Sequence, residues 1–148
     1  MTVTEDTTLV ITRNFEAPST RVFDAWLTRE EWQSWIGPDG VDCEISKLEP
    51  HVGGQYRLEM HMGGQAPIAV AGVFKIIDRP RTLSFTWGAE GDLSRQSLVT
   101  LTFTELEGKT EMTLRQEGLG SAANHDQHEQ GWNSTLNKLA RHLKREQR

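Results

Sequence analysis

The stretch GWNSTLNKLARHL, residues 131–143, decides the fold predicted for this chain. Its large apolar residues recur at spacings of four, three and four, which puts them on one side of an α-helix. These residues are Trp132, Leu136, Leu139 and Leu143. The helix can begin near Gly120 and Ser121, so we expect it to run for about twenty residues or more and to be the longest element.

The sheet that this helix packs against is predicted from the middle of the chain. Between Val41 and about Glu117, short runs alternate apolar with polar residues, and closely spaced turns separate them. The clearest run places Tyr56, Leu58, Met60 and Met62 on one face and Arg57, Glu59 and His61 on the other. Turns without intervening helices indicate an antiparallel meander. A further strand over residues 8–15 precedes it, with Leu9, Ile11 and Phe15 on one face.

Two short helices are predicted after this first strand. Pro18 opens the first, which carries Val22, Phe23, Trp26 and Leu27 at helical spacing. Thr28 and Glu31 stand three positions apart, as in a capping box, so the second helix begins at Thr28. The turn at 37–40 ends it. The fold class is therefore α+β, with a curved antiparallel sheet around a long C-terminal helix.

The dimensions of these elements suggest a cavity. Six or seven strands make a sheet roughly 30 Å across, whereas one helix covers ~10 to 12 Å. Either the sheet curls tightly around the helix or space for a ligand is left inside. The predicted lining residues are Trp35, Tyr56, Met60, Met62, Phe85, Trp87, Phe103, Gly131, Trp132 and Leu136. Large apolar side chains of this kind would equally fill a packed core.

Gly131 is the helix residue that bears most directly on this choice. A glycine inside a helix costs ~1 kcal/mol relative to alanine, so something should compensate. Close packing against the sheet is one compensation. Room for a ligand beside Trp132 is the other, and the pattern is compatible with both.

Several segments resemble, in order, the bacterial family related to the heat-shock-protein-90 ATPase activator, within the START-like superfamily called SRPBCC. They are APSTRVFDAW (17–26), WQSWIGPDG (32–40), VGGQYRLEM (52–60), IIDRPRTLSFTW (76–87), SLVTLTF (97–103) and HEQGWNSTLNKLARHL (128–143). The resemblance covers nearly the whole chain and implies a helix-grip fold with an apolar or aromatic small molecule held between sheet and helix. It also implies a chaperone contact, by likeness to the family's namesake. The chain departs from the family's paired tryptophans at Ile36, which follows Trp35.

No metal, cofactor or catalytic residue is predicted. The segment HDQHEQGW (125–132) brings together His125, Asp126, His128 and Glu129, but its spacing differs from that of H-E-x-x-H zinc sites. Alternation turns Arg57, Glu59 and His61 outward, and a slip of one residue would reverse this. Cys43 is predicted to be a small strand residue.

Composition limits the partners. The 148 residues are expected to form a single domain, 1–148, and a formal net charge of -5 argues against nucleic-acid binding. No apolar run approaches the ~20 residues of a membrane span, and no export signal is visible, so a cytoplasmic location is expected. A monomer or weak homodimer is expected.

Three functions follow as hypotheses. The first is non-catalytic binding of a hydrophobic or aromatic small molecule, lipid-like or polycyclic, in the internal cavity, with a role in stress response. The second is a protein interaction module that resembles the co-chaperone. The third is a cavity enzyme of the cyclase or hydrolase type.

Overall fold

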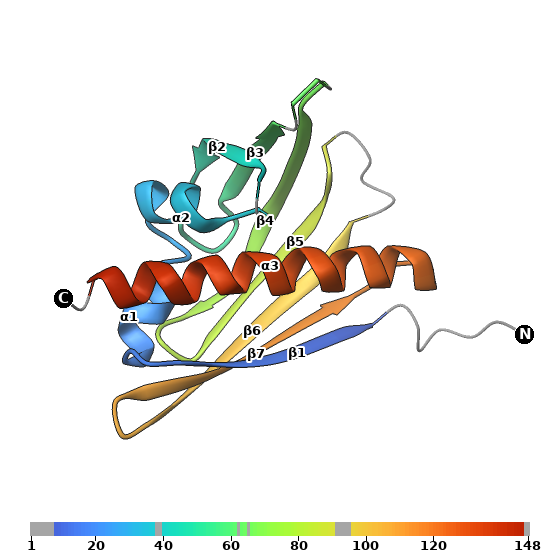
Figure 1. Cartoon of the computed structure of the whole chain (residues 1–148). Helices are drawn as coiled ribbons and strands as arrows, with labels where there is room; N and C mark the ends of the chain where they lie inside the picture. Colours follow the sequence, from blue (N-terminus) through green and yellow to red (C-terminus); the bar gives the residue numbers. More distant parts are fainter. Residues whose placement is uncertain (1–7, 38–39, 62, 65, 91–95, 147–148) are drawn as a thin grey trace, which may run out of the picture.

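The computed structural model describes residues 8–37, 40–61, 63–64, 66–90 and 96–146. Within them, seven strands form an antiparallel sheet in the order β1-β7-β6-β5-β4-β3-β2 (Figure 1). The strands are β1 (Leu9–Phe15), β2 (Asp42–Leu48), β3 (Gln55–His61), β4 (Ile68–Asp78), β5 (Thr82–Ala89), β6 (Ser97–Leu106) and β7 (Lys109–Glu117). Strands β2 to β7 each pair with the next in the chain, which confirms the predicted meander. Strand β1 extends the sheet beyond β7.

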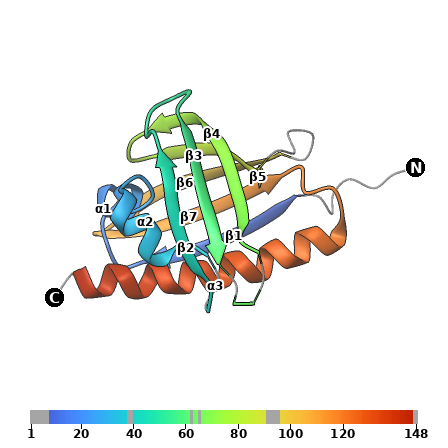
Figure 2. The same cartoon turned by 90° about the horizontal axis from the view of Figure 1, so that it is seen from above.

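The last helix lies across one face of this sheet. Helix α3 (Ala122–Glu146) crosses the strands, and Figures 1 and 2 show it from two directions. The four residues of its predicted apolar stripe are all buried: Trp132, Leu136, Leu139 and Leu143. The curved sheet and the long C-terminal helix confirm the predicted fold class. Register shifts between Ile45 and Lys47 and between Phe74 and Ile76 mark irregularities that bend strands locally.

Two short helices follow β1, as predicted: α1 (Ser19–Asp24) and α2 (Arg29–Trp35). The side-chain capping bond predicted for the start of α2 is not formed. Thr28 is the N-cap residue but makes no side-chain cap. Its hydroxyl instead donates to the carbonyl oxygen of Asp24 at 2.9 Å, which also accepts from the backbone N–H of Leu27.

The core is aromatic where the short helices meet the sheet and α3. The ring of Trp26 lies 4.7 Å from that of Trp35 and 6.0 Å from that of Trp132, and Trp32 packs on Tyr56 at 5.3 Å. Burying each such side chain contributes ~1.5 to 3 kcal/mol. Among the helices that the structure describes, none has both the length and the apolar composition of a membrane span.

Candidate ligand pocket between the sheet and the last helix

A pocket of about 470 Å³ opens between the N-terminal half of α3 and the sheet. Figure 1 shows why it lies at this end, because α1 and α2 stand beside the C-terminal half of α3. There the apolar stripe meets the aromatic core. A second space of about 420 Å³ beside that half is lined mainly by polar residues such as Gln33, Asp42 and Lys138. The volume of the pocket between α3 and the sheet falls within the ~300 to 1,000 Å³ that small-molecule sites commonly have.

One wall of the pocket is a face of α3. Six residues with spacings of three, one, three, one and three share this face: Asn124, Gln127, His128, Gly131, Trp132 and Thr135. Four of them carry polar side chains with neutral hydrogen-bonding groups. The helix therefore presents a mainly polar wall here and an apolar one further along, where its leucines enter the core.

The opposite wall comes from the sheet and is mainly apolar. Its strand residues are Met60, Ile68, Val70, Trp87, Gly88, Ala89 and Ser97. Ile36 and Gly37 after α2, and Gly118 and Leu119 before α3, complete the lining. Among these described lining residues there is no Asp, Glu, Lys or Arg, so the pocket suits an uncharged ligand.

A chain of buried hydrogen bonds fixes the indole of Trp132 and ends at the backbone of Trp87. The indole N–H of Trp132 donates to Gln116 Oε1 at 2.8 Å, and Gln116 Nε2 donates to Ser97 Oγ at 2.8 Å. The Ser97 hydroxyl then donates to the carbonyl oxygen of Trp87 at 2.7 Å. Gln116 is fully buried, and the rings of Trp87 and Trp132 lie 5.1 Å apart. The chain pre-organises an aromatic surface at one side of the pocket.

The residues predicted to line a cavity divide into two sets. Met60, Trp87, Gly131 and Trp132 line the pocket. Five others lie buried in the core, away from its lining: Trp35, Tyr56, Phe85, Phe103 and Leu136. The Tyr56 hydroxyl donates to the Thr86 carbonyl oxygen, and burial raises the pKa of that phenol. Met62 lies outside the described residues.

Sequence reasoning missed the polar half of the helix wall. Asn124 and Gln127 were not among the predicted pocket residues, and His128 was considered only as part of a metal-binding segment. Stepping back from Gly131 and Trp132 by helical spacing would have placed them on the pocket face. Ile36, which departs from the paired tryptophans, also lines the pocket.

The remaining part of the histidine-rich segment lies beside the pocket without lining it. Metal-ligating atoms of His125, Asp126 and Glu129 lie within 4.8 Å of one another. His128 is not in this group, and its Nδ1 lies 2.9 Å from the carbonyl oxygen of Asn124. Asp126 and Glu129 are exposed, which is common for helix carboxylates that bind no ion.

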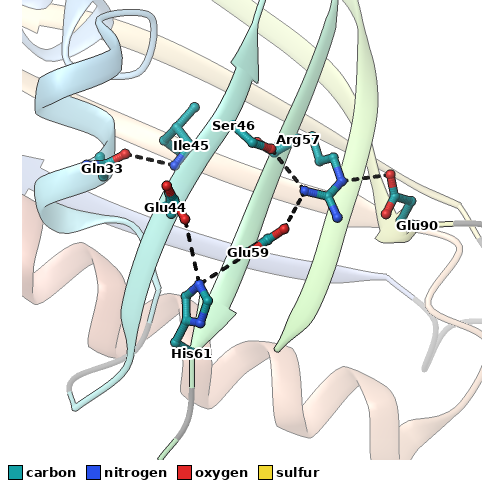
Figure 3. Close-up of polar contacts among 8 residues, drawn as sticks. All are labelled: Gln33, Glu44, Ile45, Ser46, Arg57, Glu59, His61 and Glu90. Atoms are coloured by element: carbon teal, nitrogen blue, oxygen red, sulfur yellow. Dashed lines mark hydrogen bonds and ion pairs between the residues drawn. The ribbon is translucent and has the colours of Figure 1, made fainter. Parts of the chain in front are cut away.

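A second polar cluster stands on the outer face of the sheet, as alternation predicts (Figure 3). Arg57 donates to Glu59 and Glu90 at 2.7 Å each, and its pKa is raised by these two carboxylates. Glu44 and Glu59 face each other directly across β2 and β3, with His61 Nε2 at 3.9 and 3.4 Å from their oxygens. The opposite faces of β2 and β3 contribute Ile45, Tyr56 and Leu58 to the core.

Cys43 lies in β2, half-buried near Lys138 and Asp42. Burial raises the pKa of its thiol to about 11, partly offset by Lys138. Because the thiolate is the reactive form, alkylation by iodoacetamide at pH 8 is expected to be more than tenfold slower in the folded protein than in guanidinium. Mass spectrometry of timed samples measures both rates, and equal rates would contradict the burial of this thiol.

Comparison with known proteins agrees with this architecture. Residues 16–144 match the family model described as activator of Hsp90 ATPase homolog 1-like protein. A protein from Chromobacterium violaceum is 24% identical over 90% of this chain and 94% of its own, with a TM-score of 0.83. A protein from Arthrobacter aurescens is 20% identical over 98% and 90%, with a TM-score of 0.85. The AHSA1 protein from Silicibacter pomeroyi is 27% identical over 94% and 99%, with a TM-score of 0.81. No curated protein is similar enough in sequence to count as a match.

Proposed function

This chain belongs to the family of proteins like the activator of Hsp90 ATPase homolog 1, and from that premise we propose that it binds a hydrophobic or aromatic small molecule. The ligand lies in the pocket between α3 and the sheet, and the protein does not transform it chemically. A cytoplasmic location and a part in stress response belong to the same proposal.

The observation that carries the proposal is the division of the pocket walls. A volume of about 470 Å³ is bounded by a mainly apolar wall of strand residues that includes Trp87, and by a helix wall that combines Trp132 with hydrogen-bonding side chains. Small-molecule sites commonly combine apolar walls with few polar groups in this way. A chaperone contact and catalysis in the pocket remain predictions from the resemblance, since no particular contact in the described residues favours either.

The test is a substitution on α3 that places a larger side chain in the pocket. In Gly131→Leu a leucine side chain enters the space, whereas the change from glycine favours the helix by up to ~1 kcal/mol. We expect the variant to melt no lower than the parent and to bind 2-methoxynaphthalene more than tenfold more weakly. Shifts of the Trp87 and Trp132 indole signals in NMR titrations report the binding.

The matched control is Gln130→Leu, which adds the same side chain one position away on the exposed side of α3. It should bind the probe as the parent does. If the parent protein binds neither 2-methoxynaphthalene nor 2-naphthol, the proposed function is wrong. If Gly131→Leu binds it as tightly as the parent, the probe sits elsewhere and the assigned pocket is wrong.

A further inference from the structure

We infer that the pocket selects uncharged ligands whose apolar body carries a hydrogen-bond donor, such as a hydroxyl group, and that this donor meets His128 and Asn124 on α3. The inference rests on the proposed function, because it names the ligand class of the same pocket. It is based on the polar atoms of the lining that remain able to form hydrogen bonds with a ligand.

The tautomer of His128 follows from its partner. Its Nδ1 lies 2.9 Å from the carbonyl oxygen of Asn124, and a carbonyl oxygen only accepts. In the neutral ring the proton is therefore on Nδ1, and Nε2 has a lone pair and no hydrogen. No bond from Nε2 is formed within the described residues, so the ring presents an acceptor.

The side chain of Asn124 is oriented by the same logic. Its amide nitrogen Nδ2 donates to the carbonyl oxygen of Leu119 at 2.8 Å, which fixes which end of the amide is the nitrogen. The backbone N–H of Asn124 donates to Ser121 Oγ at 3.1 Å and anchors the first turn of α3. Asn124 Oδ1 is left as a second acceptor one helical turn from His128.

The donors of two other lining residues are already engaged inside the protein. The Trp132 indole N–H is bonded to Gln116, and the Ser97 hydroxyl donates to the carbonyl oxygen of Trp87. The Thr135 hydroxyl and the exposed Gln127 amide each carry both a donor and an acceptor, so they suit either kind of ligand group. The groups of fixed orientation, on His128 and Asn124, therefore offer a ligand hydrogen-bond acceptors rather than donors.

A bound ligand must therefore supply a hydrogen-bond donor to these acceptors. Apolar groups that cover His128 Nε2 and Asn124 Oδ1 remove water from both acceptors without replacing the lost hydrogen bonds, which is unfavourable. A hydroxyl that donates to His128 Nε2 restores the lost bond there, and the preference for a donor comes from this bond. A carboxylate would bring only acceptors, and no Lys or Arg among the described lining residues would balance its charge.

The experiment compares two probes that differ in one donor. At pH 8, where imidazoles are ordinarily neutral, 2-naphthol and 2-methoxynaphthalene are titrated into the full chain and followed by the same indole NMR signals. Although the ether has more apolar surface, we expect the naphthol to bind about tenfold more tightly. In His128→Leu this ratio should fall to about one, with the affinity for the ether changed less than threefold.

Two further variants separate the inference from a general effect on the helix. His128→Gln should recover part of the preference, because the glutamine amide oxygen accepts a hydrogen bond. His125→Leu, three positions away and outside the pocket lining, should keep the parent ratio. Equal affinities in the parent, or a preference that survives in His128→Leu, would overturn the inference and leave the proposed function standing. Binding of neither probe would instead overturn the proposed function.

Discussion

Gly72→Ala is expected to destabilise the protein by about 4 kcal/mol, since overpacking against fixed backbone also breaks strand hydrogen bonds. Gly72 lies in β4, directly opposite Tyr56 on β3. A methyl group there would overlap the carbonyl oxygen of Thr86 on β5 and lie 2.7 Å from Tyr56 Cε2. Moving either neighbour costs free energy, because the carbonyl belongs to the sheet and accepts a hydrogen bond from the Tyr56 hydroxyl.

Urea unfolding at 25 °C measures this loss directly, and Gly63→Ala is the matched control. An alanine methyl at Gly63 meets nothing within 4 Å, and the backbone there has no left-handed conformation that would be strained. Its stability should change by less than about 0.5 kcal/mol. Similar stabilities for the two variants would show that β4 and β5 can separate to admit a methyl group.

The second large effect is expected for Gln116→Leu, which removes the centre of the buried hydrogen-bond chain. The indole N–H of Trp132 loses its acceptor, and Ser97 Oγ loses a donor. Each buried group left unpaired costs ~1 to 3 kcal/mol, so a total near 3 kcal/mol is expected. The Trp132 indole signal should also broaden, because the ring then loses the hydrogen bond from its N–H to Gln116.

A double-mutant cycle with Trp132→Phe distinguishes this mechanism from simple repacking. Phenylalanine has no N–H, so Gln116→Leu should cost at least 1 kcal/mol less in that background. Gln130→Leu, on the exposed side of α3, should leave stability unchanged within about 0.5 kcal/mol. Equal costs of Gln116→Leu in both backgrounds would rule out the indole bond as the source of the stability.

The fold could be predicted from the sequence because its main elements have strong local patterns. The spacing of Trp132, Leu136 and Leu139 follows the helical repeat, and the meander strands alternate apolar and polar residues between turns. The capping bond of Thr28 could not be predicted in this way. Its hydroxyl can reach two different partners, and the turn between α1 and α2 places the carbonyl oxygen of Asp24 2.9 Å from it.

The pocket was only partly within reach of the same reasoning. Gly131 and Trp132 were predicted to face a ligand, and both line the pocket. Tyr56 and Phe85 carry the same kind of pattern yet lie in the packed core, where their rings are 5.7 Å apart. Periodicity identifies which side of a strand faces inward, but it does not show where along the strand the helix and the sheet come into contact.

The sequence by itself therefore determined the elements, their order and their buried faces, because these depend on residue spacings within about four positions. The tertiary structure decided where the interior is filled and where it is open. Helices α1 and α2 stand beside only the C-terminal half of α3, so the N-terminal half faces space. It also decided the chemistry of that space, since Gln116, Ser97 and Trp132 form one hydrogen-bond chain only after β6, β7 and α3 have come together.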